Sequence, residues 1–375
     1  GAAIVDATTI VDIAVVGDGP AGLTAATIAA QAGASVLVLD RESWLGGLLG
    51  LQSQPLQGPG RGFDGSTGPE IARALRADAV EAGVEILQGA NVASLSHLTN
   101  RLWALTLNTL GVEFVARSVV LATGSTEPLP EFDGSDLTGV MLAGEAQAAL
   151  NSEGRMIGYD IVIVGSDNSG LLIAQNLFDA GANVIAVVDE SPEVQGREFN
   201  AAPLIQRGVA MLTSTRVVCA IGDDRLERIR VRRSDDDDPD HDTEIEADTL
   251  LFALPRSPDT AVAELAGCPP MDVEVLGGST PVHDSSMATT LPGLFVCGDA
   301  AGVESGAVAL ESGRIAGIYA ASYVGHDHPD ASTIVHQARG RLGFLRRGRR
   351  GEHRRSGKLA LYKEHRRTTQ STVTT

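Results

Sequence analysis

Short apolar runs alternate along this chain with longer segments in which small and apolar residues recur at helical spacing. The first run is Val11–Val16, and the Ala-rich segment Ala21–Gly33 that follows has the composition of a helix that ends at glycine. A second apolar run, Ser35–Leu39, comes next, and residues 67–70 (Thr-Gly-Pro-Glu) carry the signals of a helix start. Strands that alternate with helices pair in parallel and are covered by those helices. The pattern therefore predicts an α/β fold with parallel sheets.

The same succession of strand, glycine-rich turn, helix and strand starts again at Tyr159 and ends at Asp189, as a diverged internal repeat. Further short strands are expected at Val84–Leu87, Leu102–Thr106, Glu113–Ala116, Ser118–Ala122 and Leu291–Asp299, and a last helix at Glu304–Val324. Two more β elements, Arg225–Arg232 and Thr243–Glu246, flank the acidic run at 234–240. We interpret this run as a solvated hairpin loop, because consecutive carboxylates without a glycine turn do not match a calcium loop.

The charge of the chain is divided between two unlike regions. The 375 residues are 43% hydrophobic, enough to form two domains, and their net charge is −19. Residues 339–375 hold 12 Lys and Arg against two Glu, whereas residues 1–338 hold 17 Arg and no Lys against 46 Asp and Glu, a charge of −29. A lysine-free acidic surface stays hydrated where salt screens its self-repulsion. We therefore interpret the protein as halophilic, with a genomic preference for Arg over Lys as the alternative.

The three cysteines, Cys219, Cys268 and Cys297, are widely spaced and form no Cys-x-x-Cys pair. A disulfide scaffold and a redox-active dithiol are therefore not expected, and Cys219 and Cys297 lie in apolar runs typical of a core. No apolar stretch reaches the roughly 20 residues that cross a bilayer, and the first residues lack a signal-peptide pattern. We expect a cytoplasmic protein without membrane contact.

The first glycine-rich turn, residues 17–22 (Gly-Asp-Gly-Pro-Ala-Gly), has the spacing of a dinucleotide-binding turn. In such a turn the first glycine allows a tight bend, the second lets backbone approach the pyrophosphate, and the third lets the helix pack on the strand. The helix N-terminus also attracts negative charge. Here the turn follows a predicted strand and precedes a predicted helix. Asp40 lies at the carboxyl end of the next predicted strand, where it is placed to bind ribose hydroxyls. The Asp40 carboxylate would repel a 2′-phosphate, so the site should take FAD or NAD.

Three later segments favour FAD. Gly46 and Gly47 allow backbone to run beside an extended ligand. Residues 122–124 (Ala-Thr-Gly) end a predicted strand, and the glycine lies where the chain must leave the sheet beside the cofactor. Leu294–Asp299 ends another strand with a carboxylate, at the sheet edge where ligands bind in open α/β folds.

Five ordered motifs resemble those of the two-dinucleotide-binding-domain flavoproteins, the thioredoxin-reductase-like and pyridine nucleotide-disulfide oxidoreductase superfamily. They are GDGPAG at 17–22, LGG at 45–47, ATG at 122–124, GSDNSG at 165–170 and LPGLFVCGDAAG at 291–302. Residues 298–317, and GGLLG followed by STGPE, further resemble the flavin subunits of amine, opine and sarcosine oxidases. The superfamily's Cys-x-x-Cys pair is absent, so disulfide reduction by the usual route is not expected.

The resemblance implies two Rossmann-like dinucleotide-binding domains, the second inserted in the first. The FAD-binding domain would comprise residues 8–152 and 282–325, the NAD(P)-binding-like domain residues 153–281, and residues 326–375 would form a basic, partly disordered tail. By position, Gly17, Gly19 and Gly22 are implied to hold the FAD pyrophosphate, Asp40 the adenosine ribose and Val92 the adenine. Asp299 is implied to bind the ribityl chain, and Gly306 and Ala307 to direct N–H groups toward the flavin N1–C2 carbonyl. The other residues implied to contact the cofactor are Pro20, Ala21, Arg41, Gly46, Gly47, Ala122, Thr123, Gly124 and Gly298. The helix that opens near Ser305 would stabilise reduced anionic flavin with its positive end.

The second glycine-rich turn, residues 165–170, would by the same resemblance be a nicotinamide site. The residues implied to bind NAD(H) are Gly165, Asn168, Gly170 and Asp189, and the carboxylate of Asp189 favours NAD over NADP. Asp167 stands where the first turn has Gly19. Its side chain obstructs a phosphate, and like charges about 4 Å apart cost on the order of 4 kcal/mol at an effective dielectric of about 20. A working NADH site and a domain that only packs both stay open.

No residue is identified as catalytic, and the candidates are Glu304, Ser305 and His283. Glu304 and Ser305 lie where the flavin ring would end, and either could contact substrate. His283 could face the flavin, although a position on a loop surface is favoured. No lysine before residue 339 can serve as a base or flavin partner, and no metal site is expected.

These observations predict an FAD-dependent oxidoreductase that passes a hydride from NADH to flavin and on to an unidentified acceptor. One alternative is the flavin subunit of a heteromeric amine, opine or sarcosine dehydrogenase or oxidase with a vestigial NAD domain. Another is a non-catalytic FAD-containing sensor or docking protein. The expected partners are a small-molecule substrate, a partner subunit or protein electron acceptor, and further copies of the chain. The Arg-rich tail would neutralise the acidic body or dock a partner rather than bind nucleic acid.

Overall fold

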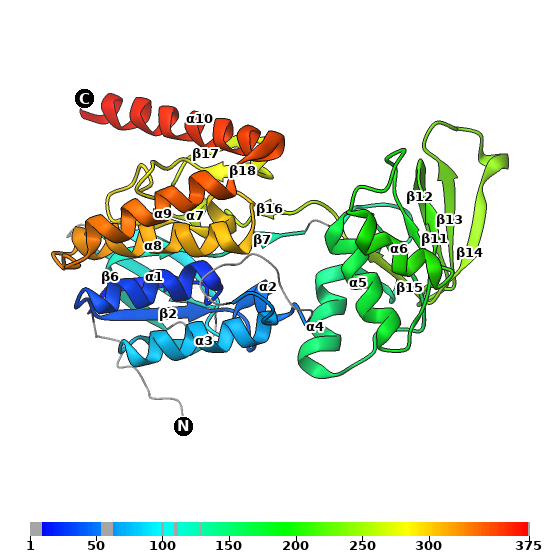
Figure 1. Cartoon of the computed structure of the whole chain (residues 1–375), viewed down its shortest axis with the longest axis horizontal. Coiled ribbons are helices and arrows are strands. Elements are labelled where there is room, and N and C mark those ends of the chain that lie inside the picture. The colour runs from blue at the N-terminus through cyan, green and yellow to red at the C-terminus, as the bar shows by residue number, and fades with distance from the viewer. Residues whose placement is uncertain (1–9, 54–62, 99–100, 109–111, 128, 374–375) are drawn as a thin grey trace. The chain divides into compact units, whose positions relative to one another are not determined.

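The computed structural model describes residues 10–53, 63–98, 101–108, 112–127 and 129–373. The chain divides into two compact units, residues 1–126 with 257–375, and residues 127–256, so the second unit is inserted in the first (Figure 1). The units change at 126/127 and 256/257, whereas the sequence-based division places these boundaries at 152/153 and 281/282. Residues 8 and 9 of the predicted first domain, and 374 and 375 of the predicted tail, lie outside the described residues.

The larger unit is built on a seven-stranded sheet in the order β3-β2-β1-β6-β5-β4, with β19 also paired to β6. The parallel strands are β1 (Ile10–Val16), β2 (Val36–Asp40), β3 (Glu85–Gln88), β6 (Glu113–Leu121) and β19 (Leu294–Val296), and the antiparallel ones are β4 (Val92–His97) and β5 (Trp103–Leu107). The carboxyl ends of β1, β2, β6 and β19 meet at one edge of the sheet. The predicted FAD-binding turns follow these four ends.

Helices cover one face of this sheet (Figure 1). The helices α1 (Pro20–Gln31), α3 (Gly68–Glu81) and α8 (Gly306–Tyr323) pack against Ile13 and Val15 of β1, and α9 (Ala331–Leu345) packs on α8. Ala14 and Val16 face the other way, into a core shared with β4, β5 and α7 (Ala261–Leu265). The remaining short elements of this unit are α2 (Gly47–Gly50), the paired β7 (Ser125–Thr126) and β16 (Ser257–Pro258), the paired β17 (Pro270–Val273) and β18 (Gly278–Pro281), and the 3₁₀ turns η2 (Glu274–Leu276) and η3 (Gly298–Ala301).

The smaller unit repeats the parallel design. Its five-stranded sheet has the order β11-β10-β9-β15-β8, and all of its pairs are parallel. The strands are β8 (Val140–Leu142), β9 (Asp160–Val164), β10 (Asn183–Val188), β11 (Ala210–Leu212) and β15 (Thr249–Phe252), and the helices are α4 (Ala143–Glu153), α5 (Asn168–Asp179) and α6 (Glu198–Gln206). The predicted α/β class with two Rossmann-like units is therefore confirmed.

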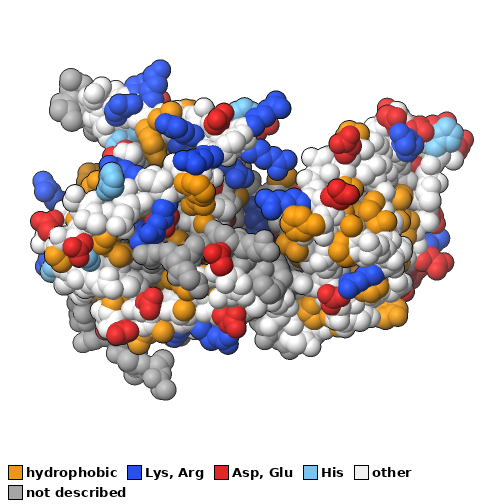
Figure 2. All heavy atoms as spheres, in the orientation of Figure 1, with side chains coloured by type: hydrophobic (Ala, Val, Ile, Leu, Met, Phe, Trp, Pro, Cys, Tyr) orange, Lys and Arg blue, Asp and Glu red, His pale blue; other side chains and the backbone are white. Residues whose placement is uncertain are grey.

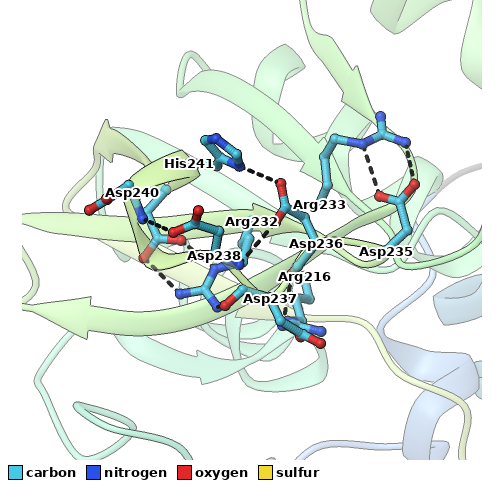
Figure 3. A network of polar contacts seen from close by, with 10 residues as sticks. Arg216, Arg232, Arg233, Asp235, Asp236, Asp237, Asp238, Asp240 and His241 are labelled. Carbon is cyan, nitrogen blue, oxygen red and sulfur yellow. Dashed lines mark hydrogen bonds and ion pairs between the residues drawn. The ribbon is translucent and has the colours of Figure 1, made fainter.

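An antiparallel sheet of β12 (Thr215–Ile221), β13 (Arg228–Arg233) and β14 (Thr243–Glu246) completes this unit, and the acidic run joins β13 to β14. Several carboxylates in this connection, which contains the 3₁₀ turn η1 (Pro239–His241), contact neighbours in the hairpin or on the adjacent strand β12 (Figure 3). Arg233 pairs with Asp235 at 3.0 Å, and His241 Nδ1 lies 2.8 Å from Asp236. The interpretation as a hairpin loop is correct. In the described part of the chain, no group of three or more His, Cys, Asp or Glu side chains is arranged to hold a metal ion.

The prediction of a partly disordered tail is wrong, because the chain beyond Gly325 forms α9 and α10 (Gly348–Val373). The Arg-rich composition conceals a buried stripe on each helix, with Val335, Ala338 and Leu342 on α9 and Leu361 on α10. Lys and Arg side chains gather on the outer surface of these helices (Figure 2). None of the helices in the described ranges is both long and apolar enough to cross a bilayer.

Candidate functional site

The first glycine turn has the steric properties that a pyrophosphate site needs. Gly17 has a φ of +111°, and a Cβ there would collide with the carbonyl oxygen of Ala122. A Cβ at Gly22 would collide with the carbonyl oxygen of Gly17, so this glycine lets α1 start against the turn. At Gly19, the N-cap of α1, an added Cβ would meet no atom within 4 Å. The middle of the turn is therefore open to a ligand, which fits the implied role of this segment toward FAD.

A pair of carboxyl groups lies beneath this turn. Asp40, at the end of β2, accepts hydrogen bonds from the backbone N–H groups of Asp18 (2.6 Å) and Glu42 (2.7 Å). The Asp18 carboxyl accepts from the N–H of Gly46 (3.0 Å) and from Gln88 Nε2 (3.2 Å). Burial, followed by the charge of Asp40, raises the pKa of Asp18 to about 7. Asp18 thus joins the first turn to the Gly46 segment, although the sequence reasoning assigned it no role.

Most of the other residues predicted to contact FAD follow strands that end at the same edge of the sheet. Val92 instead lies on the antiparallel strand β4. Pro20 and Ala21 form the start of α1, and Gly47 starts α2. Arg41 is half exposed and forms ion pairs with Glu42 (3.2 Å) and Asp259 (3.1 Å). Val92 lies buried at the start of β4, in the core on the Ala14 side of the sheet.

The segment after β6 is fixed by hydrogen bonds to Asp259. Thr123 Oγ1 donates to the Asp259 carbonyl at 2.7 Å, and the Asp259 N–H donates to the Gly124 carbonyl at 3.0 Å. Gly124 has a φ of +80°, which favours glycine, while Ala122 is buried behind Gly17. The conformation of residues 122–124 after β6 is therefore held by hydrogen bonds within the chain.

The segment after β19 runs from Gly298 to the start of α8. Gly298 donates its N–H to Ser312 Oγ at 2.9 Å, and the Asp299 carboxylate accepts from Ser125 Oγ (3.1 Å) and from the N–H of Glu304 (3.3 Å). Ser305 is the N-cap of α8, and its Oγ accepts from the N–H of Val308. Gly306 is exposed and Ala307 half-buried. The positive end of α8 thus lies beside Asp299 at the sheet edge.

The catalytic candidates Glu304 and His283 lie within one buried polar cluster, which we call the α10 cluster: His283, Glu304, Arg346, Lys358 and Tyr362. Arg346 forms a two-point ion pair with Glu304, whose side chain is 3% exposed. Lys358 Nζ lies 3.5 Å from His283 Nε2, and the His283 ring meets the edge of Tyr362 with centroids 5.9 Å apart.

Two expectations are corrected by this cluster. His283 has no exposed surface, so the favoured position on a loop surface is wrong: the ring is enclosed by α10. The chain also brings a lysine into the body, since Lys358 of the tail is buried next to His283. Sequence reasoning missed Arg346, Lys358 and Tyr362, because these lie at least 42 residues from Glu304 or His283 and no local spacing connects them.

The second glycine turn has the same backbone frame as the first. Cβ atoms at Gly165 and Gly170 would collide with the carbonyl oxygens of Ala253 and Gly165, as at Gly17 and Gly22. Asp189 accepts from the N–H of Ser166 at 2.7 Å, which repeats the bond from Asp18 to Asp40.

The middle of the second turn is filled by the chain itself. Asp167 is the N-cap of α5, and its Oδ1 accepts from the N–H of Gly170 at 3.0 Å. The Asn168 side chain accepts from the N–H of Arg197 at 2.9 Å, and the N–H of Gly196 donates to the Ser166 carbonyl at 2.8 Å. The Asp167 carboxylate thus binds one of the N–H groups at a helix N-terminus, where such groups can also bind a phosphate.

Asp189 is held as a carboxylate. Burial alone would raise its pKa, but hydrogen bonds from Ser166 and Ser191 outweigh burial and lower it. The charge of Asp189 therefore persists at the end of β10.

Residues 11–324 match the family described as pyridine nucleotide-disulphide oxidoreductase. The chain belongs to this family. The match identifies it as an oxidoreductase-family protein, and the binding of FAD with NAD(P)H by family members supports a flavin in this chain. Residues 325–375, with α9 and α10, lie beyond the matched region.

Several curated relatives belong to oxidases of more than one polypeptide. An opine oxidase subunit of Agrobacterium tumefaciens (strain Ach5) is 30% identical over 338 residues, covering 82% of this chain and 65% of the relative. The alpha subunit of sarcosine oxidase from Rhizobium meliloti (strain 1021) is 34% identical over 223 residues, 56% of this chain and 21% of the relative. The chain thus spans less than two thirds of the length of these relatives. Thioredoxin reductase of Aquifex aeolicus (strain VF5) is 26% identical over 308 residues, covering 77% of this chain and 85% of the relative.

Solved structures show the same fold. Thioredoxin reductase of T. acidophilum superimposes with a TM-score of 0.71 at 21% identity, covering 84% of this chain and 98% of that one. L-proline dehydrogenase from P. horikoshii gives a TM-score of 0.67 at 21% identity, covering 88% of this chain and 59% of that one.

Proposed function

We propose that this protein is an FAD-dependent oxidoreductase that takes its electrons from a small amine-type substrate rather than from NADH. The contrast between the two glycine turns carries the proposal. Gly19 leaves open space at the N-terminus of α1, whereas the Asp167 carboxylate already accepts an N–H at the N-terminus of α5. The first turn has room for a pyrophosphate, and the second holds an anion of its own.

The larger unit supplies the groups for holding FAD. Backbone N–H groups at the start of α1 would bind the pyrophosphate, and the carboxylates of Asp40 and Asp299 would accept hydrogen bonds from hydroxyl groups of the ribose and the ribityl chain. The N-terminus of α8 would place positive potential at the flavin end. When bound, FAD supplies a ring that accepts a hydride. The residues of the chain would bind and orient the cofactor, and the buried strands behind these residues would exclude water from it.

An amine-type substrate is favoured by the similarity to proteins named as subunits of opine oxidase and of sarcosine oxidase. Because both names describe one part of a larger enzyme, we further propose that this chain works with a partner subunit. The electron acceptor would then be provided by that partner or by a separate protein.

A second candidate keeps NADH as the electron source. It is favoured by the intact frame of the second turn, in which Gly165, Gly170 and Asp189 repeat the contacts of Gly17, Gly22 and Asp40. Under this candidate, NADH must displace the Asp167 carboxylate from the Gly170 N–H.

Anaerobic mixing of the FAD-reconstituted protein with NADH, or with secondary amino acids such as sarcosine, tests both candidates through the flavin absorbance. We expect the amine to bleach the flavin and NADH to leave it oxidised. Bleaching by NADH alone would reverse the assignment. Bleaching by neither, with FAD firmly bound, would favour a sensor or docking protein, and failure of the chain to bind FAD would refute the flavin proposal itself.

A further inference from the structure

The long C-terminal helix α10 carries one of the chain's two lysines into the interior of the larger unit. Lys358 is 3% exposed, and its Nζ donates a hydrogen bond to the carbonyl of Ala301. Lysine is rarely buried to this extent, because removing an ammonium group from water costs several kcal/mol. Replacement of buried charged groups by apolar residues of similar volume is commonly neutral or stabilising. The lysine therefore calls for an explanation other than packing.

His283 is held as an acceptor toward this lysine. Its Nδ1 lies 2.7 Å from the carbonyl oxygen of Pro281, and a carbonyl can only accept, so Nδ1 carries the proton. Nε2 then presents a lone pair to Lys358 Nζ at 3.5 Å. Burial, and then the charge of Lys358, lower the pKa of His283 well below its ordinary value, so the ring is neutral.

The contacts of α10 reach a segment that is implied to bind flavin. Ala301 ends the 3₁₀ turn that carries Asp299, and Glu304 directly precedes Ser305, the N-cap of α8. Lys358 binds the carbonyl of Ala301. Arg346, between α9 and α10, forms an ion pair with Glu304. Two polar ties therefore fix the segment 298–305 from the side of the tail.

Apolar packing brings the lysine to this place. Leu361 has no exposed surface and packs with Val273, Leu276 and Val282. Leu276 in turn accepts the N–H of Val303 through its carbonyl, at 2.8 Å. One helical turn separates Leu361 from Lys358, so both point to the same side of α10.

We propose that Lys358 is a positioning residue of the flavin site, which holds the segment 298–305 in its FAD-binding arrangement through Ala301 and His283. The inference rests on the proposed binding of flavin by this segment. It concerns a feature of this chain, because α10 lies beyond the region that matches the family. A tail helix would thereby form part of a cofactor site whose other proposed residues lie within the matched residues 11–324.

The charge of Lys358 depends on its surroundings. Burial lowers the pKa of Lys358 to about 8, Glu304 and Asp299 oppose this shift, and Arg346 adds to it. The titratable and charged groups around the cluster are His283, Asp299, Glu304, Arg346, Tyr362 and His365. Below about pH 8 the ammonium form prevails, and a charged donor strengthens the hydrogen bond to Ala301.

The test compares FAD affinity with stability in the full-length chain. The variants are Lys358→Met and the matched control Lys363→Met, which removes the exposed second lysine of the same helix. We expect Lys358→Met to weaken FAD binding about tenfold, because a hydrogen bond from a charged donor is lost. Its apoprotein should unfold at the same or a higher temperature than the wild type, and Lys363→Met should match the wild type in both measurements. The gap in FAD affinity between wild type and Lys358→Met should narrow above about pH 8.

Wild-type FAD affinity in Lys358→Met would overturn the inference, and so would an affinity loss that only follows a loss of stability. Should Lys358→Met fail to fold, Lys358→Gln replaces it, since an amide can donate to Ala301 without charge. This variant should bind FAD less tightly than the wild type, and equal affinity would again overturn the inference. A wild-type chain that binds no FAD would instead refute the proposed function, on which the inference depends.

Discussion

Asp18 and Asp167 are adjacent positions in two equivalent turns, yet they have opposite surroundings. Asp18 is fully buried beside Asp40, while Asp167 is exposed at the start of α5 and caps that helix. The first carboxyl lies behind the turn and leaves the face over Gly19 open, whereas the second occupies the corresponding face. A single residue shift in the position of an acidic side chain thus separates an open turn from a closed one.

Replacing Asp167 by Gly should open the second turn. The substitution removes the carboxylate from the Gly170 N–H, so we expect NADH to bind at least tenfold more tightly, measured by titration calorimetry. The loss of the cap should lower stability by only a few tenths of a kcal/mol. Asp167→Asn is the matched control, because Asn retains the cap without the charge. Unchanged NADH affinity in Asp167→Gly would show that the side chain is not what closes this turn.

Asp18 should make stability depend on pH. Its native pKa of about 7 lies above the value of about 3.9 for an unfolded chain, so the native state binds more protons between these values. Its contribution to stability is therefore complete below about pH 4 and is lost as the pH rises to about 7. Relative to Asp18→Asn, the wild-type apoprotein should lose about 4 kcal/mol across this window in denaturant titrations, because each pKa unit corresponds to about 1.4 kcal/mol. Parallel pH curves for the two proteins would contradict the raised pKa.

At the scale of elements, α10 should be an integral part of the larger unit. Leu361 is fully buried, while Leu359 of the same helix is 56% exposed. Leu361→Ala should lower the free energy of unfolding by about 2–4 kcal/mol, and Leu359→Ala by less than about 0.5 kcal/mol. Denaturant titrations of both variants measure the difference. Equal, small effects would mean that the tail does not pack on the body.

The elements that sequence reasoning located well are those whose burial is local and continuous. The run Val11–Val16 lies inside β1, and Ser35–Leu39 matches β2 within one residue, because strands covered on both faces are apolar throughout. The strand β4 (Val92–His97) was not predicted, since its Ala and Ser residues weaken the apolar alternation. The helices α9 and α10 were missed for a related reason: their few buried positions are separated by Arg, Glu and Gly.

The candidate site also contains a part that the sequence predicted and a part that it did not. Each glycine turn and the Asp that follows it lie within about 25 residues, and backbone sterics dictate their arrangement, so the sequence suffices. The contacts of the α10 cluster join residues 42 to 79 positions apart, and the packing of α10 through Leu361 helps to bring them together. An obstruction of the second turn by Asp167 stays a prediction, and the hydrogen bond from the Gly170 N–H to Asp167 was not foreseen.

At the scale of the whole molecule, charge is distributed unevenly. Residues 127–256 hold 25 Asp and Glu against 10 Arg, a net charge of −15 in the smaller unit alone. Several of these Arg residues pair with acidic neighbours in the hairpin of β13 and β14, among them Arg228 and Arg230 with Glu244, and Arg233 with Asp235 as Figure 3 shows. Exposed ion pairs of this kind contribute little each, so they do not offset the excess. Self-repulsion of the acidic surface should therefore be a main determinant of stability.

Salt should therefore stabilise the protein. Raising KCl from about 0.05 M to about 1 M shortens the Debye length from more than 10 Å to about 3 Å, which screens repulsion between surface carboxylates. We expect the free energy of unfolding by urea to rise by on the order of 2 kcal/mol or more over this range. KCl is the suitable salt, because sulfate would also strengthen apolar burial. Exposed ion pairs weaken in salt and act in the opposite direction, so a rise in stability measures the excess of repulsion over pairing. A flat or falling curve would instead support a genomic preference for Arg over Lys, without adaptation to salt.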